Sequence, residues 1–133
     1  MTQTILVIDD DDPIRRMVAT TLERAGFNVV GVSDGLTGLS SVKQRRPDLV
    51  IVGLLLPWLM GFDVCRRIRE LPGGATLPII VMSTVMLSDD ARREIRDHLG
   101  IQHILQKPFP FKELLDAVGA LIERSSNEPP YMA

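Results

Sequence analysis

Four consecutive carboxylates, Asp9 to Asp12, directly follow a short apolar run near the start of the chain. A hydroxyl pair, Ser83 and Thr84, follows a later apolar run, and Lys107 follows another. Carboxylates bind divalent cations such as Mg²⁺, whereas hydroxyl and ammonium groups bind phosphoryl oxygens. Adjacent carboxylates repel an anion unless a divalent cation or the lysine intervenes, so the acidic run alone is no phosphate cradle. These residues predict a polar pocket assembled from distant parts of the sequence.

Such a pocket requires the apolar runs to lie side by side. Runs of strand length alternate with stretches whose apolar residues recur at three- and four-residue spacing, which is typical of helices. Parallel strands joined by helices bring their carboxyl ends to one edge of a sheet, with helices on both faces. The predicted strands are 5–8, 27–32, 49–56, 78–82 and 101–105. The predicted helices run from an N-cap at Asp12-Pro13 to Gly26, from Leu36 to before Pro47, from Phe62 to Leu71, from Ser88 or Asp89 to before Gly100, and from Phe111 to Ile122.

The length of 133 residues fits one domain, which we expect at 1–124, followed by a flexible tail or linker stub at 125–133. Hydrophobic residues make up 45% of the chain, too many for a disordered protein, yet no apolar run approaches a membrane span. The net charge of −2 offers no attraction to nucleic acid or to an anionic membrane. The single cysteine, Cys65, excludes an internal disulfide, and the N-terminus lacks a secretion-signal pattern. We therefore expect a cytoplasmic protein that contacts neither nucleic acid nor membrane directly.

The loop after the first predicted strand disfavours nucleotide cofactors. It carries acids where a nucleotide site needs glycines, and it matches neither G-x-G-x-x-G nor G-x-x-x-x-G-K-[ST]. It also lacks the Ser/Thr-rich loop that holds a flavin phosphate. We expect no cofactor, and a small flavodoxin-like nucleotide or flavin binder is the weaker alternative from another functional class.

The order of these motifs resembles the receiver domain of bacterial response regulators, the CheY-like family. The resemblance runs from Thr4 to Ile122 and rests on an acid pair, a proline-glycine loop, a hydroxyl and a Lys-Pro pair in the family's order. The matching segments are ILVIDDDDPIRRMV, PDLVIVGLLLPWLMGFDVCRRI, PIIVMST and HILQKPF. The resemblance implies an α/β fold of the flavodoxin-like (βα)5 type, a three-layer sandwich around a five-stranded parallel sheet in the order 2-1-3-4-5.

In active receivers the acid pair helps to hold Mg²⁺, and an aspartate at the end of the third strand binds that ion and accepts a phosphoryl group from a histidine kinase. The lysine and the hydroxyl contact the phosphoryl oxygens. The matching positions are Asp9 and Asp10 for the acid pair, Ser83 with Thr84 beside it for the hydroxyl, and Lys107 for the lysine. Gly53 occupies the acceptor position. Glycine has no nucleophilic oxygen, so aspartyl phosphate cannot form there, and the metal also loses a ligand.

The family's switch is altered as well. Active receivers couple the hydroxyl to an aromatic residue on the fifth strand, but the aligned residue is Ile104, which has no ring to rotate. Together with Gly53 this implies a pseudo-receiver, a non-enzymatic signalling module that acts by protein–protein contact without phosphorylation. We expect Lys107 to neutralise Asp9 or Asp10, with no metal beyond weak residual Mg²⁺ at those acids. The resemblance also implies a cis bond after Lys107. The alternative is a phosphorylatable receiver whose natural residue 53 is aspartate and was replaced in this chain.

The resemblance implies a partner surface too. In the family, the face made by the fourth helix, the fifth strand and the fifth helix commonly meets a protein partner, a fused effector domain or a second copy. The residues expected on it are Arg93, Arg96, Gln102, Gln106 and Lys112. The alternative is that the charge-rich fourth helix is only a solvated face laced with ion pairs. Trp58 either folds over the emptied pocket or is an exposed anchor for a partner.

Overall fold

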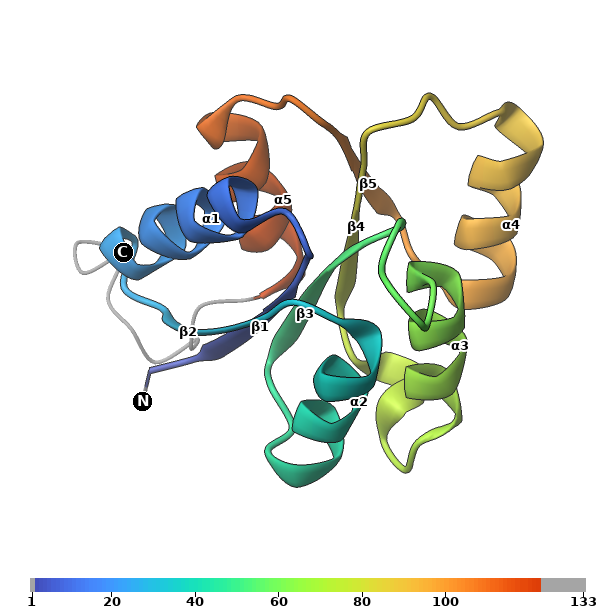
Figure 1. The fold of residues 1–133 in the computed structure, drawn as a ribbon, viewed down its shortest axis with the longest axis horizontal. Coiled ribbons are helices and arrows are strands. Elements are labelled where there is room, and N and C mark those ends of the chain that lie inside the picture. The colour runs from blue at the N-terminus through green and yellow to red at the C-terminus, as the bar shows by residue number, and fades with distance from the viewer. Residues whose placement is uncertain (1, 123–133) are drawn as a thin grey trace.

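The computed structural model of the chain describes residues 2–122, in which five parallel strands alternate with five α-helices (Figure 1). The strands are β1 (Thr4–Ile8), β2 (Asn28–Val32), β3 (Leu49–Gly53), β4 (Ile79–Ser83) and β5 (His103–Gln106). The helices are α1 (Asp12–Arg24), α2 (Gly35–Gln44), α3 (Gly61–Glu70), α4 (Asp89–Leu99) and α5 (Phe111–Leu121), with a 3₁₀ turn at Gly74–Thr76. The strand order β2-β1-β3-β4-β5 confirms the predicted flavodoxin-like fold. The tail predicted at 125–133 lies outside the described residues.

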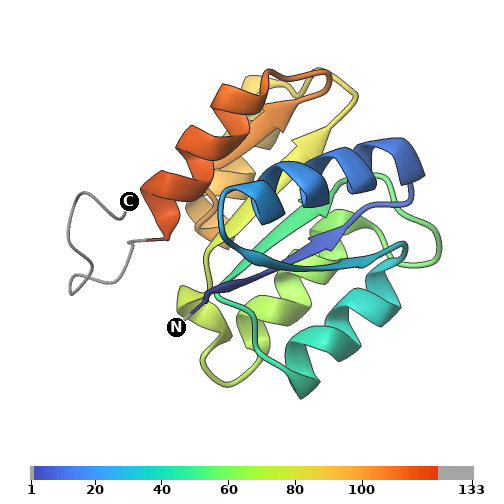
Figure 2. The same ribbon diagram turned by 90° about the vertical axis from the view of Figure 1, so that its left-hand side faces the viewer.

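Helices cover both faces of the sheet, because every central strand is apolar on both sides. Alternate strand residues face opposite layers, so in β1 Ile5 and Val7 pack toward α1 and α5, whereas Leu6 and Ile8 pack toward α2, α3 and α4. Figure 2 shows α1 and α5 on one side of the sheet and α2 and α3 on the other. Cys65 of α3 is fully buried in the second of these layers, as expected of a core residue.

The third strand is shorter than predicted, because it ends at Gly53 rather than at residue 56. Leu54 and Leu56 are buried although they lie in the loop after β3. An apolar run in the sequence therefore does not tell where a buried strand ends and a buried loop begins. The loop closes when the N–H of Gly61 donates to the Leu54 carbonyl at 2.9 Å. A Cβ at residue 61 would collide with the Gly53 carbonyl oxygen, so this close approach requires glycine.

The fifth strand begins two residues later than predicted. Gly100 adopts a left-handed φ of 66° and ends α4, and the N–H of Ile101 then donates to the Ile95 carbonyl at 3.2 Å. Ile101 therefore closes the helix rather than pairing with β4, although its side chain is buried. The limits of β1, β2 and β4 differ from the predicted ones by a single residue.

Side-chain N-caps fix the first turns of two helices, α1 and α4, which begin at the carboxyl end of the sheet. The N-cap of α1 is Asp11 rather than the predicted Asp12, since the Asp11 carboxylate accepts the Ile14 N–H at 3.1 Å. Ser88, one of the two expected residues, caps α4 by accepting the Ala91 N–H at 3.1 Å. Asp11 follows β1 and Ser88 follows β4, so each cap lies in the loop that leaves the carboxyl end of a strand.

Candidate functional site

Asp9 directly follows β1 and is 1% exposed. Its Oδ2 lies 2.6 Å from Nζ of Lys107, and its Oδ1 accepts the backbone N–H of Asp11 at 3.0 Å. The Asp9 carbonyl accepts a hydrogen bond from the Arg15 guanidinium at 2.8 Å. Both carboxylate oxygens are therefore partnered, as a buried carboxylate requires.

Lys107 reaches Asp9 from the far end of the sequence. It directly follows β5, and its backbone N–H donates to the carbonyl of Ser83 at 2.7 Å. This hydrogen bond fixes the start of the loop that leads from β5 to α5. The peptide bond between Lys107 and Pro108 is cis, as the resemblance implied. The expected contact of the lysine with the acid pair is present, and it is made with Asp9.

The next two carboxylates have different surroundings. Asp10 and Asp11 are exposed and line a cleft of about 230 Å³ at the carboxyl ends of β1, β3 and β4. The other lining residues are Gly53, Leu54, Leu55, Met82, Thr84 and Lys107. Asp11 also caps α1, whereas Asp10 takes no part in that cap.

Gly53 ends β3 at the floor of this cleft. A Cβ at residue 53 would lie 3.1 Å from Oδ2 and 3.2 Å from Cγ of Asp9. The space that an acceptor side chain would enter is therefore bounded by the carboxylate that Lys107 neutralises. The side chain of Trp58 does not fill it: Trp58 is 84% exposed, so the interpretation that it folds over the pocket is wrong.

The predicted hydroxyl pair divides between the core and the cleft. Ser83 is 2% exposed; its hydroxyl donates to the Val85 carbonyl at 2.7 Å and accepts the Val85 N–H at 3.2 Å. That hydroxyl is engaged within its own turn, and the exposed Thr84 lines the cleft instead.

The residues of the cleft fit the Mg²⁺ ion that the resemblance implies poorly, because Asp10 is the one carboxylate that they leave for it. Magnesium needs near-octahedral oxygen ligands that include one or two carboxylates. Both oxygens of Asp9 are hydrogen-bonded, Asp11 caps a helix and residue 53 offers no carboxylate, which leaves Asp10 alone. Among residues 2–122, no three His, Cys, Asp or Glu side chains are grouped so that they could hold a metal ion.

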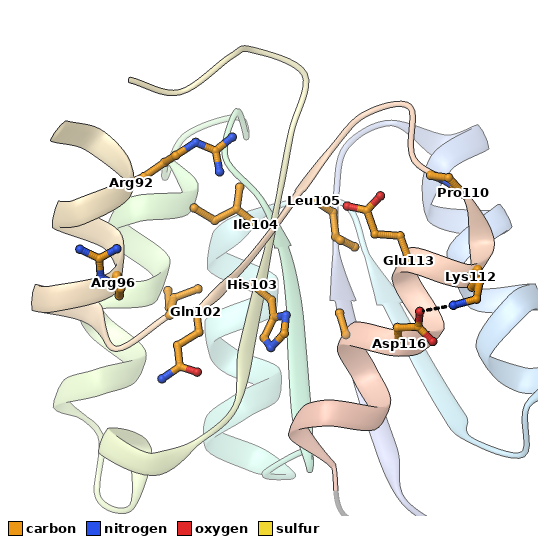
Figure 3. Close-up of a pocket in the computed structure, with 12 residues that line it drawn as sticks. Arg92, Arg96, Gln102, His103, Ile104, Leu105, Pro110, Lys112, Glu113 and Asp116 are labelled. Atoms are coloured by element: carbon orange, nitrogen blue, oxygen red, sulfur yellow. Dashed lines mark hydrogen bonds and ion pairs between the residues drawn. The ribbon is translucent and has the colours of Figure 1, made fainter. Parts of the chain in front are cut away.

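A second hollow of about 620 Å³ lies between α4, β5 and α5 (Figure 3). Arg92 and Arg96 of α4 border one side, and Lys112, Glu113 and Asp116 of α5 border the other, with an ion pair of 2.8 Å between Lys112 and Asp116. Gln102, His103 and Ile104 lie between the two helices. We call this hollow the α4–β5–α5 groove.

Three of the five predicted partner-face residues line this groove, namely Arg96, Gln102 and Lys112. Arg93 instead forms an exposed ion pair with Asp90 at 3.2 Å. Gln106 is partly buried, and within residues 2–122 its Oε1 has no hydrogen-bond partner. Helix α4 thus carries exposed ion pairs on its outer surface and borders the groove on its inner side, and its contact with a partner stays a prediction.

Ile104, at the predicted switch position, lies in β5 opposite Val81. Its side chain is partly buried, packs against the core beneath α2, α3 and α4, and lines the groove. An aliphatic side chain at this place connects the groove to the core through packing contacts.

Three features of the site were missed in the sequence. The Asp12–Arg15 ion pair has the three-residue spacing of neighbours on a helix, which would have indicated that Arg15 lies beside the acidic loop. Trp58 has a φ of 64°, a conformation that the neighbouring residues in the sequence do not predict. Val85 and Met86, apolar residues in a predicted loop, are exposed at the same edge of the sheet.

The family model described as "Response regulator receiver domain" matches residues 5–119. The chain is 36% identical over 132 residues to the DNA-binding response regulator MtrA of Mycolicibacterium paratuberculosis, covering 99% of this chain and 56% of that protein. It is 35% identical over 125 residues to the DNA-binding dual master transcriptional regulator RpaA of Synechocystis, covering 94% of this chain and 51% of that protein. The chain thus spans about half the length of these curated relatives.

Solved structures agree with this similarity. The chemotaxis response regulator CheY4 of Vibrio cholerae superposes with a TM-score of 0.84 at 28% identity, over 92% of this chain and 100% of that one. The receiver domain of a sensor histidine kinase from Pseudomonas aeruginosa, with a magnesium ion coordinated in its active site cleft, gives a TM-score of 0.80 at 29% identity over 91% of this chain and 98% of that one. Within residues 2–122, none of the helices has the length and apolar character needed to span a membrane.

Proposed function

The chain belongs to the response regulator receiver domain family, and we propose that it is a receiver that signals by protein–protein contact without aspartyl phosphorylation. The coarse role, a receiver module of two-component signalling, follows from family membership. The finer role rests on Gly53, which stands at the end of β3 where the chemistry needs a carboxylate nucleophile.

The surroundings of Gly53 support this proposal. Lys107 supplies the positive charge beside Asp9, which is buried and accepts two hydrogen bonds. A cation from solution is therefore not needed to offset the repulsion of that carboxylate. Asp9 thus has its counter-charge within the protein in the unmodified form.

The path by which phosphorylation would be reported is also changed. The Ser83 hydroxyl is held by Val85 inside its own turn, and Ile104 packs against the core. We infer that the conformation of the α4–β5–α5 groove is set by packing rather than by a covalent modification.

We propose that this groove meets a protein partner, a fused effector domain or a second copy. Its opposing borders carry Arg92 and Arg96 on α4, and Glu113 with the Lys112–Asp116 ion pair on α5, which suits a surface of mixed charge. Residues 1–124 would form the receiver module, and contact with DNA would be made by another part of the complete protein, as the DNA-binding relatives suggest.

Incubation with acetyl phosphate and Mg²⁺ tests the central claim. We expect intact-protein mass spectrometry to show no base-labile phosphoryl adduct on this chain, with a phosphorylatable receiver treated in parallel as the positive control. A stoichiometric adduct that is lost in base would overturn the proposal. Sequencing codon 53 in the source gene separates it from the alternative, since an aspartate codon there would mean that the natural protein is phosphorylatable.

A further inference from the structure

The exposed apolar side chains of this protein are concentrated at the carboxyl end of the sheet. Of nine large hydrophobic residues that are exposed within residues 2–122, five lie in the loops that follow β3 and β4. We call these five the apical patch: Leu55 (53% exposed), Trp58 (84%), Met60 (41%), Val85 (47%) and Met86 (83%). Leu55 also lines the cleft opposite Thr84, so the two loops flank one hollow.

The most exposed member, Trp58, is held in an unfavourable backbone conformation. Its φ of 64° lies in the left-handed region, which costs an L-residue with a side chain about 1–2 kcal/mol. The loop imposes this φ, because Leu59 donates to the Pro57 carbonyl at 2.7 Å and Gly61 donates to the Leu54 carbonyl at 2.9 Å. A large ring that is almost wholly in water recovers none of this cost by burial in the free protein.

The rim of the patch is acidic. Asp10 and Asp11 line the cleft, and Asp89 and Asp90 lie in the first turn of α4, just after Met86, where Asp90 is paired with Arg93 at 3.2 Å. Lys107 is the one basic residue among those that line the cleft within residues 2–122, and its ammonium is paired with Asp9. The carboxylates of Asp10, Asp11 and Asp89 therefore accompany the loops that carry the apical patch.

This charge pattern selects among occupants. An anionic membrane or a nucleic acid would be repelled by the rim. A twofold dimer through the patch would bring the acids of two copies together, which is unfavourable. Strand addition needs an open sheet edge, whereas the patch lies beyond the ends of β3 and β4.

From these observations we propose that the apical patch binds a cationic amphipathic helix of another protein or domain. Apolar side chains spaced three and four residues apart on that helix would contact Trp58 and Met86, and its Lys or Arg residues would contact the acidic rim. The inference goes beyond the proposed function, because it assigns a second contact surface apart from the α4–β5–α5 groove. It does not depend on whether the receiver is phosphorylated.

Synthetic peptides test the proposal, because Trp58 is the only tryptophan of the chain and reports on the patch directly. The probe is a peptide of about 18 residues, or five helical turns, with Leu at helical spacing and Lys elsewhere; its partner probe has Glu in place of Lys. We expect the Leu/Lys peptide to bind saturably with a blue shift of Trp58 emission that weakens as salt rises. The Leu/Glu peptide should leave the emission unchanged.

Variants locate the binding. Calorimetry should show at least tenfold weaker binding of the Leu/Lys peptide to the double variant Trp58→Ala/Met86→Ser and a smaller loss for Asp10→Asn. The matched control is Phe111→Ser, which removes another exposed apolar side chain, on α5, and should bind as the parent does. Equal binding to the double variant, equal binding of the two peptides, or self-association that the double variant abolishes would each overturn the proposal.

Discussion

Nζ of Lys107 lies 2.6 Å from Oδ2 of Asp9, and the two side chains are 10% and 1% exposed. They are separated by 98 positions in the sequence, and their ion pair joins the loops after β1 and β5 across the sheet. The ammonium group of Lys107 thus lies beside Asp9, an acid that the resemblance assigns to metal binding. Gly53, which has no side chain, is the neighbouring residue on β3.

Replacing Lys107 with Met should destabilise the protein strongly, because it leaves the Asp9 carboxylate buried without its cation. We expect a loss of about 3–5 kcal/mol in the free energy of unfolding, measured in urea. The double variant Asp9→Asn/Lys107→Met should recover part of that loss. Lys112→Met, which removes an exposed pair with Asp116, is the control and should change the stability by less than about 0.5 kcal/mol.

Replacing Gly53 with Asp should make stability depend on Mg²⁺. The new side chain would begin 3.1 Å from Oδ2 of Asp9, so two carboxylates would compete for Lys107, and we expect a loss of about 1–3 kcal/mol without metal. Millimolar Mg²⁺ should restore stability in the variant through binding to the folded state, and leave the parent protein unchanged.

The control for this experiment is Gly53→Ala, which adds the Cβ without the charge. Thermal unfolding of the three proteins with and without Mg²⁺ separates crowding from repulsion. A parent protein whose melting temperature rises with Mg²⁺ as much as that of Gly53→Asp would contradict the interpretation of the cleft.

Stability should decline in alkali because of Cys65. Burial raises the pKa of the Cys65 thiol from 9.0 to about 12. Between these values the unfolded chain loses the thiol proton and the folded protein keeps it, so the contribution to stability is complete below pH 9 and falls as pH rises toward 12. The slope is at most about 1.4 kcal/mol per pH unit.

Urea unfolding at several pH values above 8 measures this slope, and Cys65→Ala removes the titrating group. We expect the variant to lose stability less steeply with pH than the parent does, although it is less stable at neutral pH because a buried side chain is truncated. Parallel slopes for the two proteins would contradict the assignment to Cys65.

Relief of the left-handed backbone at Trp58 should stabilise the free protein. Trp58→Gly, which accepts a φ of 64° without steric cost, should raise the free energy of unfolding by about 1 kcal/mol. Trp58→Ala keeps the backbone cost and removes only an exposed ring, so its stability should stay close to that of the parent. If Ala stabilised the protein as much as Gly, the ring rather than the backbone would be the source of the effect.

Local sequence patterns were sufficient for the order of elements and for the family. Apolar runs, helical spacing and the glycines and prolines between them are properties of neighbouring residues, and they predicted every strand and helix with errors mainly at the ends. The largest errors have a common cause: Leu54, Leu56 and Ile101 are buried in loops, and burial alone does not distinguish a strand from a loop.

The sequence by itself determined that residue 53 carries no nucleophile, since that follows from the identity of one amino acid. Only the tertiary structure decided that Lys107 pairs with Asp9, that the Ser83 hydroxyl turns to Val85, and that Trp58 points into water. Each of these depends on how a strand ends and in which direction its loop closes. Those directions are set by contacts between residues far apart in the chain, which no local pattern encodes.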